Sequence, residues 1–267
     1  MWDIHMHSYF SGDSDANPEE MILSAINKGL EGICFTDHHD IDYPKEPDEP
    51  DFLIDFTRYF KELNALGEKY EGRIKVGIGI ELGLQPHIFK EHKMVMTENN
   101  FDMCIGSVHV VEKKDPYYGS FYDGRSEEDA FRSYFEDTIK NLKTFNDFDV
   151  LGHIGYLVRY APNRSKNYHP EHFSDMIDEI LRFIIDHGKG IECNTSGYRG
   201  GLENPIPSRW ILERYFRLGG KIITLGADAH KPEDVAADFS AAASLLKDIG
   251  FKYYTVFEKR KPVFLPL

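Results

Sequence analysis

The chain begins Met1-Trp2-Asp3-Ile4-His5-Met6-His7-Ser8-Tyr9-Phe10-Ser11-Gly12-Asp13. The apolar residues around His5 and His7 are typical of a β-strand. Successive side chains on a strand point to opposite faces, so these two histidines are expected on the same face. Asp13 follows six residues after His7, on a predicted turn. Imidazole nitrogen and carboxylate oxygen are ligands for zinc, manganese and iron. The stretch predicts one wall of a metal site, provided that other strands supply further ligands.

The same order of short apolar strand, polar loop and amphipathic helix repeats along the chain. Strands are expected over residues 2–7, 32–36, 74–81, 101–107, 148–152, 190–194 and 221–225. Helices are expected over residues 17–29, 52–70, 86–99, 126–145, 170–187, 207–218 and 232–249, with an extended closing segment over 251–265. Seven strand–helix units favour parallel strands joined by helical crossovers. No linker or change of composition divides the chain, so a single domain over residues 1–267 is expected.

Two α/β architectures fit this order, a barrel and an open sheet. A barrel brings the carboxyl ends of all its strands to one mouth, whereas an open sheet gathers functional residues only where its strand order reverses. Polar residues end most of the predicted strands, which favours a closed or nearly closed barrel of about seven strands. No glycine-rich nucleotide-binding motif is present.

The overall composition excludes several classes of protein. The formal net charge is −14, from 45 acidic and 31 basic residues, which argues against a general nucleic-acid partner. No apolar run approaches the ~20 residues that span a bilayer, so no membrane association is expected. No signal peptide is visible. The three cysteines, Cys34, Cys104 and Cys193, show no paired spacing, which indicates a reducing, cytoplasmic location.

Potential metal ligands follow nearly every predicted strand. They are His5, His7, Asp13, Asp37, His38, Glu81, His109, His153, Asp228 and His230. Any one of them has an ordinary explanation as a core histidine or a solvated acid. Together they would place imidazole groups at the same end of five of the seven strands, which chance does not explain. The sequence therefore predicts a multinuclear metal site at the barrel mouth.

The ordered set of motifs resembles the PHP (polymerase and histidinol phosphatase) superfamily. The motifs are His5-x-His7, Thr36-Asp37-His38, the strand end at Glu81, Ser107-Val108-His109, Gly152-His153 and Asp228-Ala229-His230. The resemblance implies a distorted (β/α)7 barrel with two to three divalent ions, which would be zinc, manganese or iron. It implies that His5, His7, Glu81 and Asp228 bind one ion, while Glu81, His109 and His153 bind a second. Asp13, His38 and His230 would bind the third, although some relatives have histidine at the position of Asp13.

Such a site suits a phosphate ester, because metal ions attract the phosphate and activate water for in-line attack on phosphorus. Arg159 and Arg199 follow two strand ends and are the candidates for binding the phosphate, since guanidinium pairs with phosphate oxygens. Asn194 could add a neutral donor. Several residues are left open as the acid that protonates the leaving group, namely Asp37, His39, Asp228 and His230, and Asp37 could instead orient a ligand histidine.

Within the superfamily, the size and the stretch Glu192-x-Asn194-Thr195-Ser196-Gly197 resemble stand-alone histidinol-phosphate phosphatases of histidine biosynthesis. The expected reaction is hydrolysis of L-histidinol phosphate to L-histidinol and phosphate. Acids of residues 40–51 would meet the substrate amine, and an aromatic lid would cover its imidazole, formed by Tyr117, Tyr118, Phe121 and Tyr122. The alternatives are a phosphoesterase for another small ester or a phosphodiester, and a non-catalytic or proofreading PHP module of a replication assembly. The oligomeric state is left open.

Overall fold

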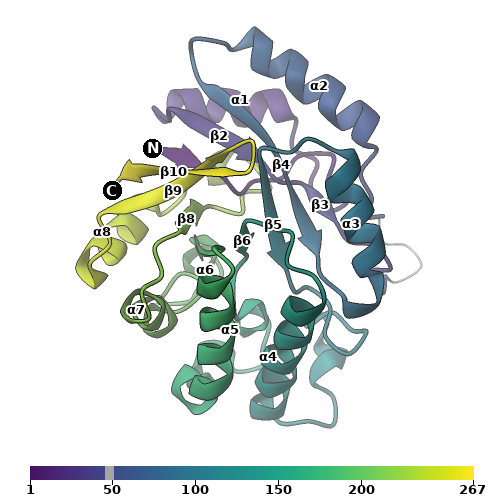
Figure 1. Ribbon diagram of the computed structural model, residues 1–267, viewed down its shortest axis with the longest axis vertical. Helices are drawn as coiled ribbons and strands as arrows, with labels where there is room; N and C mark the ends of the chain where they lie inside the picture. Colours follow the sequence, from purple (N-terminus) through teal and green to yellow (C-terminus); the bar gives the residue numbers. More distant parts are fainter. Residues whose placement is uncertain (46–50) are drawn as a thin grey trace.

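The computed structural model describes residues 1–45 and 51–267. A parallel sheet curls around the centre in the order β1-β2-β4-β5-β6-β7-β8, and β3 pairs beside β4 (Figure 1). The strands are β1 (Trp2–Asp3), β2 (Gly32–Phe35), β3 (His38–His39), β4 (Lys75–Gly83), β5 (Met103–Ser107), β6 (Val150–Leu151), β7 (Gly190–Asn194) and β8 (Ile223–Gly226). The distorted barrel with seven strand positions, expected from the sequence, is confirmed.

The barrel closes between its first and last strands. The chain beyond β1 runs beside the chain beyond β8, and the amide of His7 donates to the carbonyl of Ala229 at 2.8 Å. The amide of Asp228 donates back to the carbonyl of His5 at the same distance. These bonds are local bridges and not a continuous ladder, so the regular part of the first strand is shorter than the predicted residues 2–7. The closure places the first and last predicted ligand motifs side by side.

Helices surround the barrel in the order expected for crossovers (Figure 1). They are α1 (Pro18–Asn27), α2 (Phe56–Lys69), α3 (Phe89–Glu98), α4 (Glu127–Thr144), α5 (Ser174–Asp186), α6 (Ser196–Arg199), α7 (Arg209–Arg217) and α8 (Phe239–Ile249). Short 3-10 turns occupy residues 86–88, 119–122, 156–159, 164–167, 170–173 and 232–234. Each long helix turns an apolar face to the sheet. In α5, Ile177, Ile180, Leu181 and Ile184 are buried at the spacing of a single helical face.

Three local predictions differ from the structure. The helix expected from residue 52 begins at Phe56, because the carboxylate of Asp55 caps the amides of Thr57 and Arg58. The helix expected over residues 232–249 begins only at Phe239, after a separate 3-10 turn and a left-handed residue at Asp238 (φ 59°). Residues 196–199, expected within a loop, form the single helical turn α6.

The C-terminal segment, predicted only to be extended, forms a hairpin of β9 (Tyr253–Glu258) and β10 (Lys261–Pro266). The hairpin lies near the N-terminus in Figure 1. Its turn contacts the amino ends of β5 and β6, because the amide of Arg260 donates to the carbonyl of Asp102 and its guanidinium pairs with Asp149. The polar residues of the functional site lie at the opposite, carboxyl ends of the strands.

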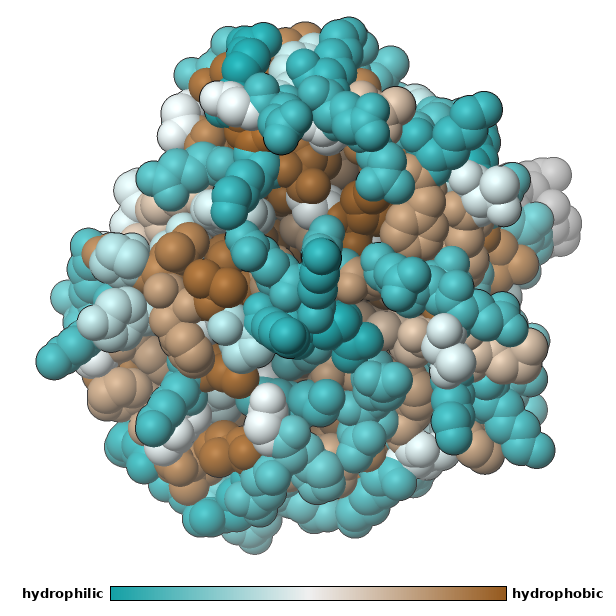
Figure 2. All heavy atoms as spheres, turned by 45° about the horizontal axis from the view of Figure 1, so that its top comes forward, coloured by the Kyte–Doolittle hydropathy of each residue, from teal (hydrophilic) through white to brown (hydrophobic). Residues whose placement is uncertain are grey.

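On the face shown in Figure 2, hydrophobic side chains form small groups separated by hydrophilic ones, which is ordinary for a folded surface. In the part of the chain that the structure describes, no helix combines the length and apolarity needed to cross a bilayer. Cys34, Cys104 and Cys193 are free and buried.

A substitution at Asp3 can test how much the barrel closure contributes to the stability of the fold. The buried carboxylate of Asp3 accepts from the amides of His5 (3.3 Å), Ala227 (3.0 Å) and Ala236 (2.8 Å), and so ties β1 to the segment after β8. Asp3→Asn replaces one acceptor oxygen with a donor, leaving at least one buried amide unpaired. We expect a loss of about 1–3 kcal/mol in the free energy of unfolding, measured by urea denaturation. The exposed Asp123→Asn should change it by less than about 0.5 kcal/mol.

Candidate metal centre

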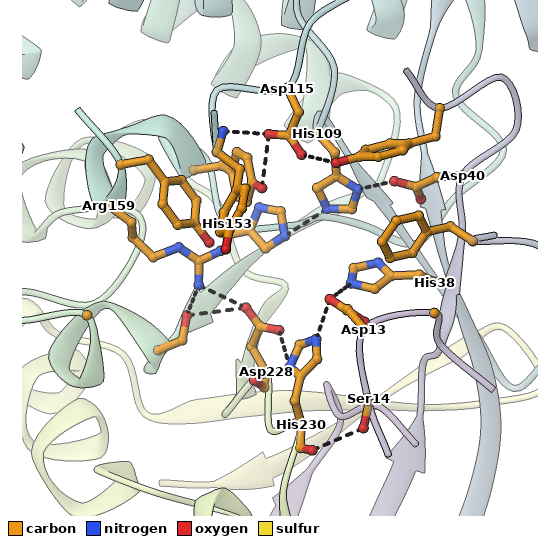
Figure 3. Close-up of a pocket in the computed structure, with 18 of the residues that line it drawn as sticks. Asp13, Ser14, His38, Asp40, His109, Asp115, His153, Arg159, Asp228 and His230 are labelled. Atoms are coloured by element: carbon orange, nitrogen blue, oxygen red, sulfur yellow. Dashed lines mark hydrogen bonds and ion pairs between the residues drawn. The ribbon is translucent and has the colours of Figure 1, made fainter. Parts of the chain in front are cut away.

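A cavity of about 920 Å³ opens at the carboxyl ends of the strands (Figure 3). It gathers histidines and acids on one side, arginines on a second and aromatic residues on a third. Its walls include Asp13, His38, Asp40, Tyr43, Phe52, His109, Asp115, Tyr117, Tyr118, His153, Tyr156, Arg159, Tyr160, Arg164, Ser196, Arg199, Asp228 and His230. His5, His7 and Glu81 lie fully buried against the same cluster, below the cavity surface.

The first predicted ligand set comes together around two histidines of the N-terminal strand. The Nε2 atoms of His5 and His7 are 3.1 Å apart. Oε2 of Glu81 lies 3.3 Å from the first and 3.5 Å from the second. Oδ1 of Asp228 lies 3.8 Å and 3.3 Å from the same two nitrogens. The alternation of side chains along the chain places His5 and His7 together, and the barrel closure brings Asp228 beside them. With Glu81, four potential ligand atoms therefore surround one point.

The second set shares Glu81 with the first. Oε1 of Glu81 lies 2.8 Å from Nε2 of His153 and 3.3 Å from Nε2 of His109, and these two nitrogens are 3.4 Å apart. β4, β5 and β6 are neighbours in the barrel, so the ends of three adjacent strands supply the three side chains. Because its two oxygens face different histidine pairs, Glu81 is placed to bridge two sites.

The third set is the most open to solvent. Oδ2 of Asp13 lies 3.1 Å from Nε2 of His230 and 3.6 Å from Nε2 of His38. Nδ1 of His38 also lies 2.9 Å from Oε2 of Glu81, so His38 stands between this set and the first. The side chain of Asp13 is 40% exposed, whereas Glu81 is fully buried. All nine predicted metal ligands are therefore brought into one cluster.

The hydrogen bonds behind the cluster set the tautomers of three histidines. Nδ1 of His5 donates to Oε1 of Glu192 at 2.6 Å, and Nδ1 of His109 donates to Oδ2 of Asp40 at 2.7 Å. Nδ1 of His7 lies 3.0 Å from Oγ of Ser11, whose own proton bonds Asp37. With the proton on Nδ1, each neutral ring carries its lone pair on Nε2, facing the other ligands.

This arrangement fits divalent cations. Lone pairs of imidazole nitrogens and carboxylate oxygens converge at short distances, and Oε2 of Glu81 is buried without a hydrogen-bond partner. Without a cation, such groups repel or must bind protons. Desolvation opposes ionisation, yet the surrounding histidines hold the pKa of Glu81 well below its usual range. Burial lowers the pKa of His153. The donor set contains nitrogen and oxygen but no thiolate, which suits zinc, manganese or iron.

Two arginines stand beside Asp228. Nη1 of Arg159 lies 2.6 Å from Oγ of Ser196 and 3.2 Å from Oδ2 of Asp228. Its guanidinium lies over the rings of Tyr156 and Tyr160. Nη2 of Arg199 donates to the backbone carbonyls of Ala227 (2.6 Å) and Asp228 (3.0 Å). The structure thus brings both predicted phosphate-binding residues to the cavity next to the ligand cluster.

Three residues predicted for catalysis or phosphate binding, His39, Asp37 and Asn194, do not line the cavity. His39 follows His38 on β3 and points to the opposite side, where its Nδ1 accepts from the amide of Ile54 at 3.1 Å. Burial lowers the pKa of His39 to about 4. Asp37 is enclosed by Ser8 and Ser11, so its link to the site runs through Ser11 to His7. Neither side chain lines the cavity, so Asp37 and His39 are not placed to protonate a leaving group. Of the four residues that the sequence left open for this role, Asp228 and His230 remain.

Asn194 is the third of these residues. Its amide nitrogen lies 3.2 Å from Oε2 of Glu192 and 3.3 Å from Oδ2 of Asp228, and its oxygen accepts from Ser196. The side chain of Asn194 is fully buried and does not line the cavity, whereas Ser196, which is 5% exposed, does. At this end of β7 the cavity wall therefore includes Ser196, the first residue of the turn α6, and not the predicted Asn194.

The aromatic lid is also only partly as expected. Tyr117 and Tyr118 line the cavity, and the side chain of Tyr117 is among the exposed large hydrophobic residues. Phe121 and Tyr122 lie in the core instead, where the hydroxyl of Tyr122 donates to the carbonyl of Leu157. A short 3-10 turn over residues 119–122 rotates these two rings away from the cavity.

Three buried acids near the site make contacts that the sequence did not predict. Asp40 and Glu192 support ligand histidines, and Asp115 accepts from the hydroxyls of Tyr43 (2.6 Å) and Tyr156 (3.3 Å) within the aromatic wall. Glu192 carried a readable signal, because it is an acid inside an otherwise apolar strand. Asp40 and Asp115 lie in polar loops, where an acid has no distinctive pattern.

Residues 3–196 match the PHP domain family. The chain is 34% identical over 262 residues to a probable histidinol-phosphatase of Clostridium acetobutylicum, covering 97% of this chain and 98% of the relative. It is 32% identical over 260 residues to the histidinol-phosphatase of Lactococcus lactis, covering 97% and 95%. A crystal structure of histidinol phosphate phosphatase from Lactococcus lactis, complexed with zinc, L-histidinol and phosphate, has a TM-score of 0.89 and 32% identity, covering 98% of each chain.

These matches agree with the motifs and with the barrel. The family match covers residues 3–196 of 267, and the two relatives align along nearly the whole chain. The likeness in three dimensions extends over the same length. The chain belongs to the PHP domain family.

Proposed function

We propose that this protein is a metal-dependent phosphatase that hydrolyses L-histidinol phosphate to L-histidinol and phosphate. The observation that carries the proposal is one cavity that opens on a cluster of nine imidazole and carboxylate groups, with two arginines and an aromatic wall around a buried acid. These parts match the phosphate, the imidazole and the amine of the substrate. The Lactococcus lactis relative, 32% identical, has been crystallised with zinc, L-histidinol and phosphate.

The first part of the proposal concerns the metal ions. We assign two to three divalent ions to the three sets described above, with Glu81 shared between the first and second. Such ions, when bound, offset phosphate charge and lower the pKa of a water molecule towards about 7, which supplies a nucleophile at neutral pH. Zinc is the first ion to test because it is present in the relative's structure, and manganese and iron are compatible with the same donors.

The arginines supply the phosphate contacts in this proposal. Arg159 and Arg199 approach the ligand cluster from one side of the cavity, beside Asp228. A planar guanidinium can donate two parallel hydrogen bonds to non-bridging phosphate oxygens, and this contact strengthens as charge develops on them. Arg159 is held by Ser196 and by two tyrosine rings, which limits the freedom that it loses on binding.

The leaving alcohol needs a proton. Of the residues left open by the sequence, Asp228 and His230 line the cavity, whereas Asp37 and His39 do not. His230 is the better placed of the two for exchange with solvent, because its side chain is 28% exposed and that of Asp228 only 6%. We propose a water molecule beside His230 as the proton source, because Nε2 of His230 is assigned to the third metal set and its Nδ1 lies 3.1 Å from the backbone carbonyl of Asp228.

The aromatic wall would receive the organic part of the substrate. Tyr43, Tyr117 and Tyr156 surround the carboxylate of Asp115, which is 5% exposed and at the cavity surface. An imidazole can pack on these rings, and a protonated amine can pair with the acid. This assigns to Asp115 the task first expected of the acids in residues 40–51. Among those acids, Asp40 is engaged with His109, Asp42 pairs with His87, Asp51 pairs with Lys45, and residues 46–50 lie outside the described residues.

The proposal also covers the partner of this protein and its location in the cell. A small phosphate ester as substrate needs no nucleic-acid surface, in keeping with a net charge of −14. A cytoplasmic location is proposed because the three cysteines are free and buried. The alternative of another small phosphate ester is distinguished by the specificity tests below.

Removal of metal should abolish activity. Dialysis against a chelator is expected to reduce phosphate release from L-histidinol phosphate to background, and added Zn²⁺ or Mn²⁺ should restore it. His153→Ala should lower kcat by at least about two decades, because it removes a proposed ligand of the second set. His187→Ala, an exposed histidine on the far side of α5, is the control. Activity that survives both chelation and His153→Ala would rule out the metal mechanism.

Loss of an arginine should weaken phosphate binding. Arg199→Ala is expected to raise KM or lower kcat by one or more decades, and Arg199→Lys to recover only part of it, since an ammonium lacks the planar fork. Arg159→Ala should behave similarly. Arg182→Ala, on the exposed face of α5, is the matched control and should leave both constants unchanged. Unchanged kinetics in Arg199→Ala would remove this residue from the site.

Asp115 tests the substrate assignment. Asp115→Asn should raise KM for L-histidinol phosphate about tenfold or more, because a charged contact to the amine is lost. It should change KM for a generic aryl phosphate by less than about twofold. Asp42→Asn, an exposed acid of the earlier loop, should affect neither substrate. Equal effects of Asp115→Asn on both esters, or equal turnover of both by the wild type, would contradict the specific assignment.

A further inference from the structure

Glu192 is a buried carboxylate to which the proposed reaction gives no role. It lies in β7 and is 1% exposed. Its ion-pair partner is His5 rather than a lysine or an arginine. Burying a carboxylate costs several kcal/mol unless strong hydrogen bonds compensate for the lost water. The contacts of its two oxygens therefore indicate what the residue does.

The two oxygens of Glu192 reach different ligand sets. Oε1 accepts from Nδ1 of His5 at 2.6 Å, and His5 belongs to the first set. Oε2 accepts from the backbone amide of His153 at 3.0 Å, and His153 belongs to the second set. The first contact fixes the tautomer and the ring plane of His5. The second holds the strand end from which the side chain of His153 projects.

Asn194 extends this support to a further ligand. Its amide nitrogen donates to Oε2 of Glu192 (3.2 Å) and to Oδ2 of Asp228 (3.3 Å). The orientation of the amide is set by its oxygen, which accepts from the backbone amide of Ser196 at 2.9 Å. Glu192 is thus connected at once to ligands of the segments that follow β1, β6 and β8.

The neighbouring strand leaves space for this residue. Gly226 ends β8, opposite Asn194 in the sheet register. A Cβ atom at Gly226 would lie 2.3 Å from Oε1 of Glu192 and 2.4 Å from Cβ of His5. Any other residue would push the carboxylate and the imidazole apart. The sequence of β8 is therefore adapted to the close contact between Glu192 and His5.

We infer that Glu192 is a positioning residue that couples the first and second metal sites by ordering His5 and His153 together. This inference rests on the proposed metal centre. Carboxylates that orient ligand histidines typically contribute 10- to 100-fold to metal affinity. A carboxylate shared between two ligand sets makes the binding of neighbouring ions depend on one side chain.

Glu192→Gln tests the inference, because glutamine keeps the shape but offers one acceptor. If its oxygen faces the amide of His153, its NH2 faces Nδ1 of His5 and moves the ring proton to Nε2, where the ligand lone pair is needed. If the amide is reversed, the N–H of His153 loses its acceptor. We expect Zn²⁺ affinity, measured by competition with a chromophoric chelator, to fall about 10- to 100-fold.

The coupling between the first and second metal sites can be tested separately, by counting the Zn²⁺ ions that each variant retains. After dialysis against a weak chelator, Glu192→Gln should retain fewer Zn²⁺ equivalents per chain than His230→Ala, which removes a ligand of the third set alone. Retention of equal equivalents by the two variants would overturn the coupling of two sites. If the glutamine variant does not fold by circular dichroism, Glu192→Asp replaces it, because its carboxylate is too short to span both contacts.

Asp102→Asn is the matched control for a merely structural effect. Asp102 accepts from the amides of Ile78 (3.0 Å) and Lys259 (3.1 Å) at the opposite end of the barrel. Its amide variant should lower thermal stability but leave Zn²⁺ affinity within about twofold of the wild type. If Glu192→Gln behaves as Asp102→Asn does, Glu192 is structural only. If the wild type itself retains no Zn²⁺, the metal centre fails and the inference fails with it.

Discussion

The fully buried carboxylate of Glu81 is the constraint on which the functional site depends. Its two oxygens lie 2.8 to 3.3 Å from the nearest ring nitrogens of His5, His38, His109 and His153. A buried anion is tolerated only where cations or donors compensate for its lost hydration. The histidines do so in part, and divalent ions between nitrogen and oxygen would do so fully. The surrounding strands can therefore be understood as a frame that brings ligands to this one acid.

That frame requires a closed barrel. Glu81 lies on β4, the third strand position, while the first ligands follow β1 and the last follow β8. The closure between the segments that follow β1 and β8, through the amides of His7 and Asp228, brings ligands more than 220 positions apart into contact, as with His7 and Asp228. The supporting hydrogen bonds of Glu192 and Asp40 lie immediately behind the ligands. Stability of the fold and geometry of the site are consequently carried by the same set of strand ends.

The strands, the helices and the nine proposed ligands could largely be predicted, because each leaves a local signal. Apolar runs mark the strands, helical spacing marks faces such as that of α5, and ligands follow directly after strands. Helix starts were less accurate where a cap or a left-handed residue decided them, as at Asp55 and Asp238. Residues 196–199 were missed as a helical turn because a single turn has no periodicity to detect.

The amino-acid sequence alone established the parallel barrel, the class of donor atoms and the family resemblance, since these depend on residue order and spacing. The tertiary structure decided which polar residues face the cavity. It turned His39 and Asn194 away, moved Phe121 and Tyr122 into the core, and brought Asp115 and Glu192 into contact with the site. The reason is that side-chain direction in loops, and contacts between distant strands, follow from packing and burial rather than from local pattern.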